Sequence, residues 1–507
     1  MTTSPSPEKP ASDNGPSAGA VTAVLAFGGI VVALMQTLVV PLISELPALL
    51  HASTADATWV ITATLLSGAV TTPVVGRLGD MFGKRRMLLA SLGMLVIGSV
   101  VSAFSDSLAP MVVGRALQGC AMGVIPLGIS IMRDELPPEK LGAAMALMSS
   151  SLGVGGALGL PGAALLAQHA NWHALFWVSA GLGAAVLALV LVFVPESRVR
   201  SGGRFDLVGG VGLTAGLLCL LLAVSKGADW GWASGSTGGL FAAGVVIVLV
   251  WGWWELRSAQ PLVDLRTTVD RQVLLTNLAS IMVGFAMFGM SLVLPQLLQM
   301  PKATGYGLGQ TMLVAGLCLA PAGLVMMVVA ALSAKVTAAF GPKVSLMIGA
   351  AVIATGYGLG IALMGAVWQL ILVAAVIGAG IGFAFGSMPA LIVAAVPRSE
   401  TASANGLNAL MRAIGTSVAS AVLGVVLAHM TTDFGGYAFP SEAGFRTAMG
   451  IGGGAAIGAL LLTAFLPGRR ANGLATAPDD ESASEKPTAE ERSPAQDATA
   501  RHGADGA

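Results

Sequence analysis

Residues 76–86 read Gly-Arg-Leu-Gly-Asp-Met-Phe-Gly-Lys-Arg-Arg, and this stretch decides the fold. It separates two long apolar runs, so it predicts a tight turn between two helices, with Asp80 beside a basic cluster. A carboxylate in this position can pair with an arginine or cap the N-terminus of a neighbouring helix. Such a contact can hold two parts of a protein together until they rock apart. The residues with a predicted gating role in this stretch are Gly76, Asp80, Gly83, Arg85 and Arg86.

The composition is that of a membrane protein. The chain has 507 residues, of which 55% are hydrophobic and 10% are charged, with a mean hydropathy of +0.81. Soluble domains carry about 25% charged residues, so a soluble enzyme is excluded. The formal net charge is zero, which gives no attraction to nucleic acid. We therefore expect the lipid bilayer as the surroundings of this chain.

Fourteen apolar runs are long enough to cross a bilayer, because a spanning helix needs about 20 residues. They lie near 20–43, 57–76, 87–104, 109–131, 142–167, 174–194, 205–224, 238–256, 273–298, 310–332, 343–363, 367–390, 402–429 and 445–466. These runs predict an all-α membrane protein. The expected units are an N-tail (1–19), an N-terminal six-helix half (20–194), two extra helices (205–256), a C-terminal six-helix half (273–466) and a C-tail (467–507). Both tails are polar, and we expect them to be disordered.

Basic residues predict the orientation of these helices. With the N-terminus inside, 21 lysines and arginines lie on the inner side and three, Lys226, Lys302 and Arg446, on the outer side. Cytoplasmic loops carry the excess of Lys and Arg. We therefore expect a multi-pass protein with both termini in the cytoplasm. The high content of Ala and Gly and the scarcity of Lys fit a high-GC bacterial source, so the expected location is a bacterial inner membrane.

Three further stretches carry polar or glycine-rich patterns inside apolar runs. Gly114–Gly119 reads GRALQG, and it places Arg115 and Gln118 on one helix face. Gly155–Gly162 reads GGALGLPG, in which Gly159 and Pro161 predict a kinked and closely packed helix. The third stretch, Asn171–Trp177, reads NWHALFW and precedes the sixth run.

Taken together with residues 76–86, these stretches resemble the motifs of the major facilitator superfamily. The count of fourteen spans and the NWHALFW stretch resemble the drug:proton antiporter branch of that superfamily. The resemblance implies two six-helix halves with two extra central helices, and export of drug-like or natural-product molecules by alternating access. It also implies coupling to the proton gradient, and in the superfamily the GGALGLPG type of motif marks exporters. No cofactor or metal is implied, and we expect a monomer whose partners are a small-molecule substrate, lipid and protons.

The second half contains an altered copy of the opening stretch, in residues 333–343. It keeps Gly341 and basic residues, but Ala338 stands where the first copy has Asp80. A repeated half is expected for alternating access around a central site. Near the start of the thirteenth run, Asn405, Asn408 and Arg412 fall on one helix face, and we expect them in gating, in substrate contact or in packing.

The first helix departs from the pattern of the branch. The branch commonly has an acid where this chain has Met35 and an asparagine where it has Val40. A proton-coupled exporter needs a group whose protonation alternates between the access states. Three alternatives stay open: Glu45 serves from an outer vestibule, an inner-face acid serves, or the chain is a facilitative or uptake carrier without proton coupling. The inner-face candidates are Asp80 and Asp134.

The expected substrate cavity is mostly apolar with few polar groups, which suits amphipathic drug-sized compounds. Without an acid at mid-depth, Arg115 and Arg412 favour neutral or anionic solutes. Five scattered histidines exclude a membrane enzyme, and the absence of a phosphate-binding loop leaves a gradient as the energy source. The predicted cavity residues are Gln36, Thr37, Arg115, Gln118, Asn277, Phe285, Phe288 and Gln296.

Overall fold

The computed structural model describes residues 17–39, 42, 46–197, 199–202, 204–434 and 437–467. Glu45, one of the predicted proton-coupling candidates, lies outside these residues. So do residues 1–16 and 468–507, which make up nearly all of the two predicted tails.

Among the described residues, fourteen helices are long and apolar enough to cross a membrane, as predicted. The helices of the first part are α1 (Ala18–Thr37), α2 (Leu46–Leu49), α3 (Thr54–Ala57), α4 (Trp59–Phe82), α5 (Lys84–Ala103), α6 (Leu108–Gly119), η2 (Cys120–Gly123), α7 (Val124–Glu135), α8 (Pro138–His169) and α9 (His173–Phe193). The following elements are α10 (Leu207–Trp230), α11 (Gly235–Arg257), α12 (Leu265–Val269), α13 (Arg271–Gln299), η3 (Lys302–Thr304) and α14 (Met312–Phe340). The last are α15 (Pro342–Ala362), α16 (Val367–Ala395), η4 (Arg398–Glu400), α17 (Thr401–His429), β1 (Thr431–Phe434), β2 (Tyr437–Pro440) and α18 (Glu442–Ala464).

The predicted span at 109–131 is interrupted. It consists of α6, the 3₁₀ turn η2 and α7, which together fill one candidate span, Leu108–Glu135. Pro126 lacks the backbone N–H that would bond to the carbonyl of Met122, four residues earlier, so the regular α-helical ladder breaks in η2. The hairpin of β1 and β2 was not anticipated by the apolar runs.

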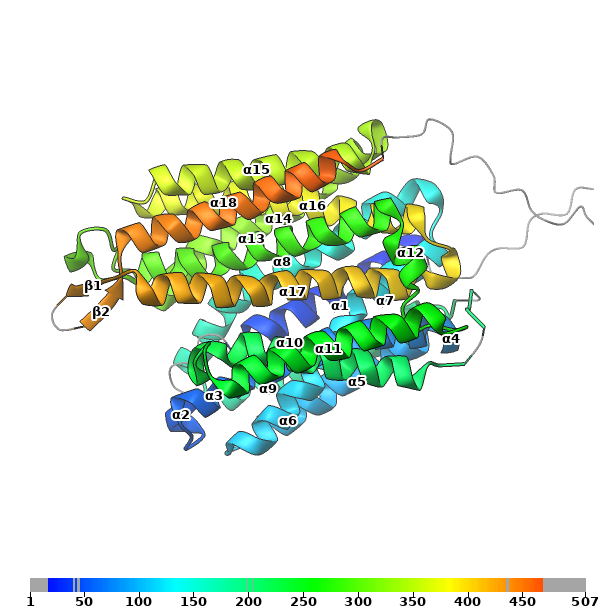
Figure 1. The fold of residues 1–507 in the computed structure, drawn as a ribbon, viewed down its shortest axis with the longest axis horizontal. Coiled ribbons are helices and arrows are strands. Elements are labelled where there is room, and N and C mark those ends of the chain that lie inside the picture. The colour runs from blue at the N-terminus through cyan, green and yellow to red at the C-terminus, as the bar shows by residue number, and fades with distance from the viewer. Residues whose placement is uncertain are drawn as a thin grey trace, which may run out of the picture. The chain divides into compact units, whose positions relative to one another are not determined.

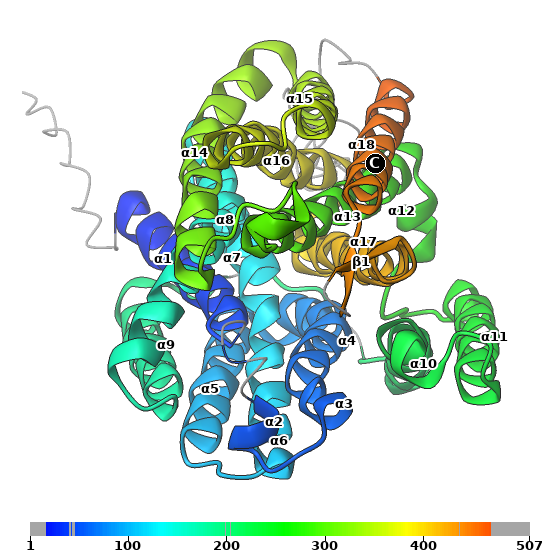
Figure 2. The same ribbon diagram turned by 90° about the vertical axis from the view of Figure 1, so that its left-hand side faces the viewer.

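Two hydrophobic clusters form the core. One is built mainly from α1 to α9 and the other from α13 to α18. The two groups meet along α4 with α17 and along α8 with α14, and Figure 2 shows the two helices of each pair side by side. The boundaries 20–194, 205–256 and 273–466 remain predictions.

Of the two extra helices, which are labelled in Figure 1, α10 lies beside α4 and α17, and α11 lies on the outer side of α10 (Figure 2). Apolar residues of α10, among them Leu213 and Leu217, pack with Ala69 of α4 and Leu407 of α17 in a separate cluster. Only 11% of the span Gly235–Arg257, which is α11, is buried. Of the pair, α10 therefore reaches the contact between the two main groups, and α11 covers it from outside.

Candidate functional site

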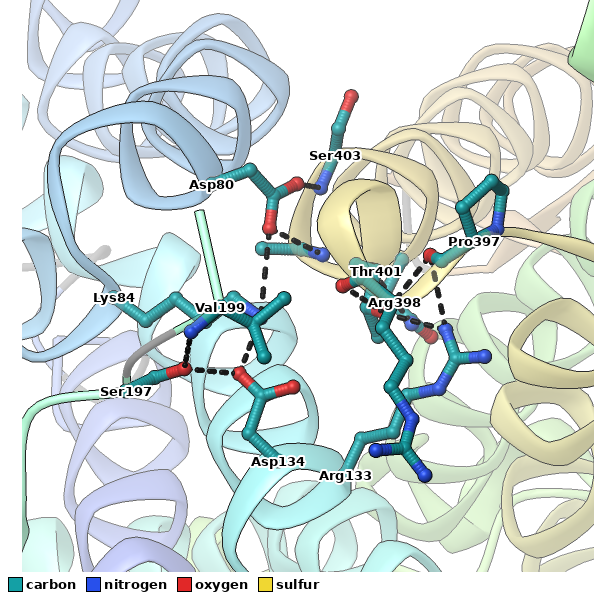
Figure 3. Close-up of polar contacts among 12 residues, drawn as sticks. Asp80, Lys84, Arg133, Asp134, Ser197, Val199, Pro397, Arg398, Thr401 and Ser403 are labelled. Atoms are coloured by element: carbon teal, nitrogen blue, oxygen red, sulfur yellow. Dashed lines mark hydrogen bonds and ion pairs between the residues drawn. The ribbon is translucent and has the colours of Figure 1, made fainter. Parts of the chain in front are cut away.

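Asp80 joins the two groups of helices at one end of the molecule. Its carboxylate accepts the backbone N–H of Ser403 at 2.8 Å and that of Ala402 at 3.3 Å, both in the first turn of α17 (Figure 3). The side chain is fully buried. The first N–H groups of a helix have no partner within the helix, and the helix dipole favours a negative charge there. Asp80 is therefore an N-terminal anchor for α17 that is supplied from α4.

Two glycines make this anchor possible. A Cβ on Gly76 would lie 2.7 Å from the carbonyl oxygen of Ala402, so only glycine lets α4 approach α17 this closely. Gly83 has φ +120° between α4 and α5, a conformation that side chains with a Cβ rarely adopt. The turn thus depends on Gly83, and the contact between the groups depends on Gly76.

Lys84 lies in a buried charge network behind Asp80. Its Nζ is 2.5 Å from Oδ2 of Asp134 and 3.8 Å from Oδ1 of Asp80, and Ser197 donates to the same oxygen of Asp134. All three ionisable side chains are 2% exposed or less. Because a buried charge is costly unless it is paired, this lysine ties the two carboxylates together and fixes the position of Asp80.

Among the described residues, the polar partners of Arg85 and Arg86 belong to the N-terminal group. Arg85 donates to the carbonyl of Leu191 at the end of α9 at 2.6 Å, and its backbone N–H donates to Glu196 at 3.3 Å. Arg86 lies 3.9 Å from the same carboxylate and is largely exposed. Arg85 therefore joins the turn to the end of α9, and both arginines lie beside Glu196 in the segment that follows this helix.

A second link between the groups was missed by the sequence analysis. Arg133, at the end of α7, donates to the carbonyls of Val396 at 3.0 Å and Pro397 at 3.1 Å, and to the hydroxyl of Thr401 at 2.5 Å. These acceptors lie where α16 ends and α17 begins (Figure 3). A cation is favourable at the C-terminal end of a helix. Asp80 and Arg133 thus hold opposite sides of the same connection between α16 and α17.

A cavity of about 130 Å³ lies between the two groups. Its walls come from α1, α4, η2, α7, α8, α10, α13 and α17, and they are mainly apolar. The polar residues in the wall are Gln36, Thr72, Ser225, Arg412, Thr416 and Ser417. No Asp or Glu is among the described residues that line it. Gln36 is the predicted cavity residue that lies in this wall. Arg412, which was predicted to act in gating, in substrate contact or in packing, lies there as well.

A chain of hydrogen bonds supports Arg412. Its Nη1 donates to Oδ1 of Asn408 at 2.8 Å, and Nδ2 of Asn408 donates to Asn277 at 2.9 Å and to Ser280 at 2.7 Å. The polar face predicted for α17 therefore meets α13 as well as the cavity. Asn405 lies nearer the start of α17 and donates to the carbonyl of Thr401 at 2.9 Å.

Arg115 and Gln118 lie outside the residues that line the cavity. Arg115 donates to Gln118 at 2.7 Å, to the carbonyl of Val60 at 3.2 Å and to that of Met35 at 3.3 Å. Gln118 donates to Ser99 at 2.8 Å. The two side chains are buried among α1, α4, α5 and α6, where they join these helices together.

The other predicted positions lie in packing contacts between helices. Thr37 donates to the carbonyl of Leu34 at 3.0 Å, and a Cβ on Gly159 would overlap the Thr37 hydroxyl, so Gly159 allows α1 and α8 to touch. Pro161 is inside α8. Phe285 is buried in the C-terminal cluster and Phe288 packs against it. Gln296 is half-buried and is not among the cavity-lining residues.

Comparison with known proteins identifies the family. The model of the Major Facilitator Superfamily matches residues 25–420. The chain belongs to this superfamily. It is therefore a transporter rather than an enzyme, and the resemblance inferred from its motifs and the predicted fold are confirmed.

Several curated relatives of this chain are named as export, resistance or transport proteins. The tetracenomycin C resistance and export protein of Streptomyces glaucescens is 29% identical over 470 residues, which cover 89% of this chain and 84% of that protein. Multidrug resistance protein Stp of Mycobacterium tuberculosis is 28% identical, covering 73% of this chain and 68% of its own. The probable actinorhodin transporter of Streptomyces coelicolor is also 28% identical, and the match covers 73% of this chain and 65% of that protein.

Solved structures show the same fold. The human organic anion transporter MFSD10 has a TM-score of 0.62 and 16% identity, covering 88% of this chain and all of that chain. The proton:xylose symporter XylE has a TM-score of 0.61 and 16% identity, with coverage of 89% and 96%. At this level of identity the likeness concerns the arrangement of helices alone.

Proposed function

We propose that this major facilitator superfamily transporter exports drug-like or natural-product small molecules by alternating access, driven by the proton gradient. The observation that carries the proposal is the cavity walled by helices of both groups and closed at one end by links between them. A central site that is closed on one side is what alternating access requires. The names of the relatives, which refer to tetracenomycin C, actinorhodin and multidrug resistance, support export of natural products.

We place the closed end in the cytoplasm. The excess of Lys and Arg in the loops at the Asp80 end supports this orientation, with both termini on that side. The described state then faces outward or is occluded. Opening toward the cytoplasm requires Asp80 to leave the N-terminus of α17 and Arg133 to leave the end of α16.

The gating role assigned to Asp80 rests on its position between moving parts. Lys84 keeps a charge beside Asp80 when the contact with α17 is broken, because it lies on the same side of the interface. Charge-assisted hydrogen bonds contribute about 1.5–3 kcal/mol each, so the two bonds to α17 are strong enough to bias the closed state. Gly76 contributes by permitting the close approach.

In this proposal, Asp80 and Asp134 are the groups that bind and release the coupled proton. Both carboxylates lie at the closed end and share Lys84. Protonation of Asp80 would remove the charge that α17 attracts, and would thereby favour the open state. The contact would re-form when the proton leaves.

A second candidate function is a facilitative or uptake carrier without proton coupling. The described wall of the cavity contains no carboxylate, and this observation favours the second candidate. In such a carrier, substrate binding alone would break the contact between Asp80 and α17.

Transport into inside-out vesicles distinguishes the two candidates. An imposed pH gradient would drive uptake of Hoechst-type dyes and of a panel of neutral and acidic antibiotics, with an ionophore and the Asp80→Asn protein as controls. Uptake that disappears with the gradient supports the antiporter. Protein-dependent uptake that survives collapse of the gradient contradicts proton coupling and supports the second candidate. Vesicles with no protein-dependent uptake of any compound would contradict export of such molecules.

A further inference from the structure

Arg412 lies near the middle of α17, with its side chain at the cavity. The helix begins at Thr401 and rises about 1.5 Å per residue, so Arg412 is roughly 16 Å from its start. The residue lines the cavity together with Ala409, Ala413 and Thr416 of the same helix. A cationic group at this depth is costly unless something compensates its charge.

Among the residues that the structure describes, no anionic side chain is paired with Arg412. None of the ion pairs between described residues includes it, and no described carboxylate lines the cavity. Its contacts are the neutral amide of Asn408 and the face of the Phe385 ring, whose centroid is 5.0 Å from the guanidinium carbon. A guanidinium has five N–H donors, so these contacts leave several donors for a ligand.

The orientation of Arg412 is fixed by Asn408, which is itself hydrogen-bonded to α13. Asn408 accepts from Arg412 while it donates to Asn277 and Ser280 of α13. The amide of Asn408 cannot turn without losing these bonds. The guanidinium is therefore held in position before any ligand arrives, which lowers the entropy lost on binding.

Arg115 is the informative contrast. It is also buried in the membrane-spanning region, but two backbone carbonyls and Gln118 accept its hydrogen bonds. It lies away from the cavity, among four helices of one group. The N–H groups of Arg115 thus have acceptors within the protein, and its role is structural. The side chain of Arg412 instead lines the mainly apolar cavity between the two groups of helices.

We propose that Arg412 is the counter-ion for an anionic, amphipathic substrate whose apolar body lies against the cavity wall. A carboxylate matches the planar guanidinium fork with two parallel hydrogen bonds, and the oxygens of a sulfonate or a phenolate can also accept from it. Met122, Ile125, Leu152 and Met287 supply the apolar contact for the rest of the molecule. This inference rests on the proposed transport function, because it concerns the same cavity.

Binding of two matched probes to the full-length protein tests the proposal. The protein is placed in nanodiscs of zwitterionic lipid, so that no anionic lipid competes. The anionic probe is 8-anilinonaphthalene-1-sulfonate, and N-phenyl-1-naphthylamine is its neutral counterpart without the sulfonate. Fluorescence titrations, corrected with empty nanodiscs, give both dissociation constants. The variants are Arg412→Gln, Arg412→Lys and the control Arg446→Gln, which removes an exposed arginine at the start of α18.

We expect the wild-type protein to bind the sulfonate at least about tenfold more tightly than the neutral probe, since a hydrogen bond to a charged group contributes this much. Arg412→Gln should lose the preference while its affinity for the neutral probe stays the same, which also shows that the variant is folded. Arg412→Lys should keep part of the preference, and Arg446→Gln all of it.

Equal affinity of the wild type for the two probes would overturn the proposal, as would a preference that survives in Arg412→Gln. These outcomes are separate from failure of the proposed function. Vesicle transport of neutral compounds without a sulfonate preference would refute only the role of Arg412. A sulfonate preference without transport of any compound would refute only the transport proposal.

Discussion

The turn at residues 76–86 and its copy at residues 333–343 both contact the last helix of their own half, but they differ in the contact with the other half. In the first copy Arg85 donates to the end of α9, and in the second Lys343 donates to the carbonyls of Ala464 and Leu466 at the end of α18, at 2.8 and 2.6 Å. Both turns contain a glycine with positive φ, Gly83 and Gly341. Each turn is thus fastened within its own group of helices.

The first copy carries a side-chain contact between the two groups of helices. Asp80 reaches the first turn of α17, whereas Ala338 has no side chain that could cap the corresponding helix α8. The N-cap residue of α8 is Pro137, whose own side chain makes no cap hydrogen bond. The comparison teaches that the two turns are fastened in the same way, each within its own half. The side chain that closes the Asp80 end, however, is supplied by the N-terminal half.

The largest effect in this comparison is expected for Asp80→Ala. It removes both charge-assisted bonds to α17, each of about 1.5–3 kcal/mol, and leaves Lys84 with Asp134 only. We expect a loss of transport of about tenfold or more in the vesicle assay. Ala338→Asn is the matched control in the second copy and should transport within about twofold of the wild type. Equal losses in the two variants would contradict the asymmetry.

Gly76→Ala should have the next largest effect. The new methyl group would lie 2.7 Å from a backbone oxygen of α17, and overpacking of this kind costs about 1–3 kcal/mol. Transport should fall about three- to tenfold. Gly93→Ala makes the same change in α5 where no atom lies within 4 Å, so it controls for the higher helix propensity of alanine. A Gly76→Ala protein as active as Gly93→Ala would show that close approach at Gly76 is dispensable.

Arg133→Gln tests the second link between the groups. The variant loses the charge that faces the end of α16 but keeps a hydrogen-bonding amide. We expect about a threefold loss of transport, and a smaller loss for Arg133→Lys. The same initial-rate measurement in vesicles serves for both. Activity unchanged in Arg133→Gln would leave Asp80 as the sole gating contact.

The smallest effect is expected for Arg85→Gln and Lys343→Gln, which loosen the equivalent contacts within each half. Each should lower the free energy of unfolding by about 1 kcal/mol, less than the buried bonds of Asp80 because these contacts are exposed to solvent, and leave transport within about twofold. Thermal unfolding of the purified proteins measures the first quantity. A transport defect in one variant but not in the other would mean that the two turns differ within their halves as well.

The fold could be predicted from the sequence because each span is a separate apolar run and the loops carry the basic residues. The role of Asp80 as a cap could also be anticipated, since the motif places an acid at a helix end. Arg133 could not be found, because its partners lie more than 260 positions away and carbonyl groups leave no mark in a sequence. For the same reason nothing distinguished Arg115, which lies among four helices, from Arg412, which lines the cavity.

The most direct test of the account measures closure of the Asp80 end. Spin labels at Lys140→Cys in α8 and Lys335→Cys in α14 report on exposed positions of the two halves, after Cys120, Cys219 and Cys318 are replaced by serine. Pulsed electron paramagnetic resonance gives the distance distribution between the labels in lipid. The account predicts that Asp80→Asn adds a population at longer distance, whereas Ala338→Asn leaves the wild-type distribution unchanged. An unchanged distribution in Asp80→Asn would contradict the claim that this contact holds the two halves closed.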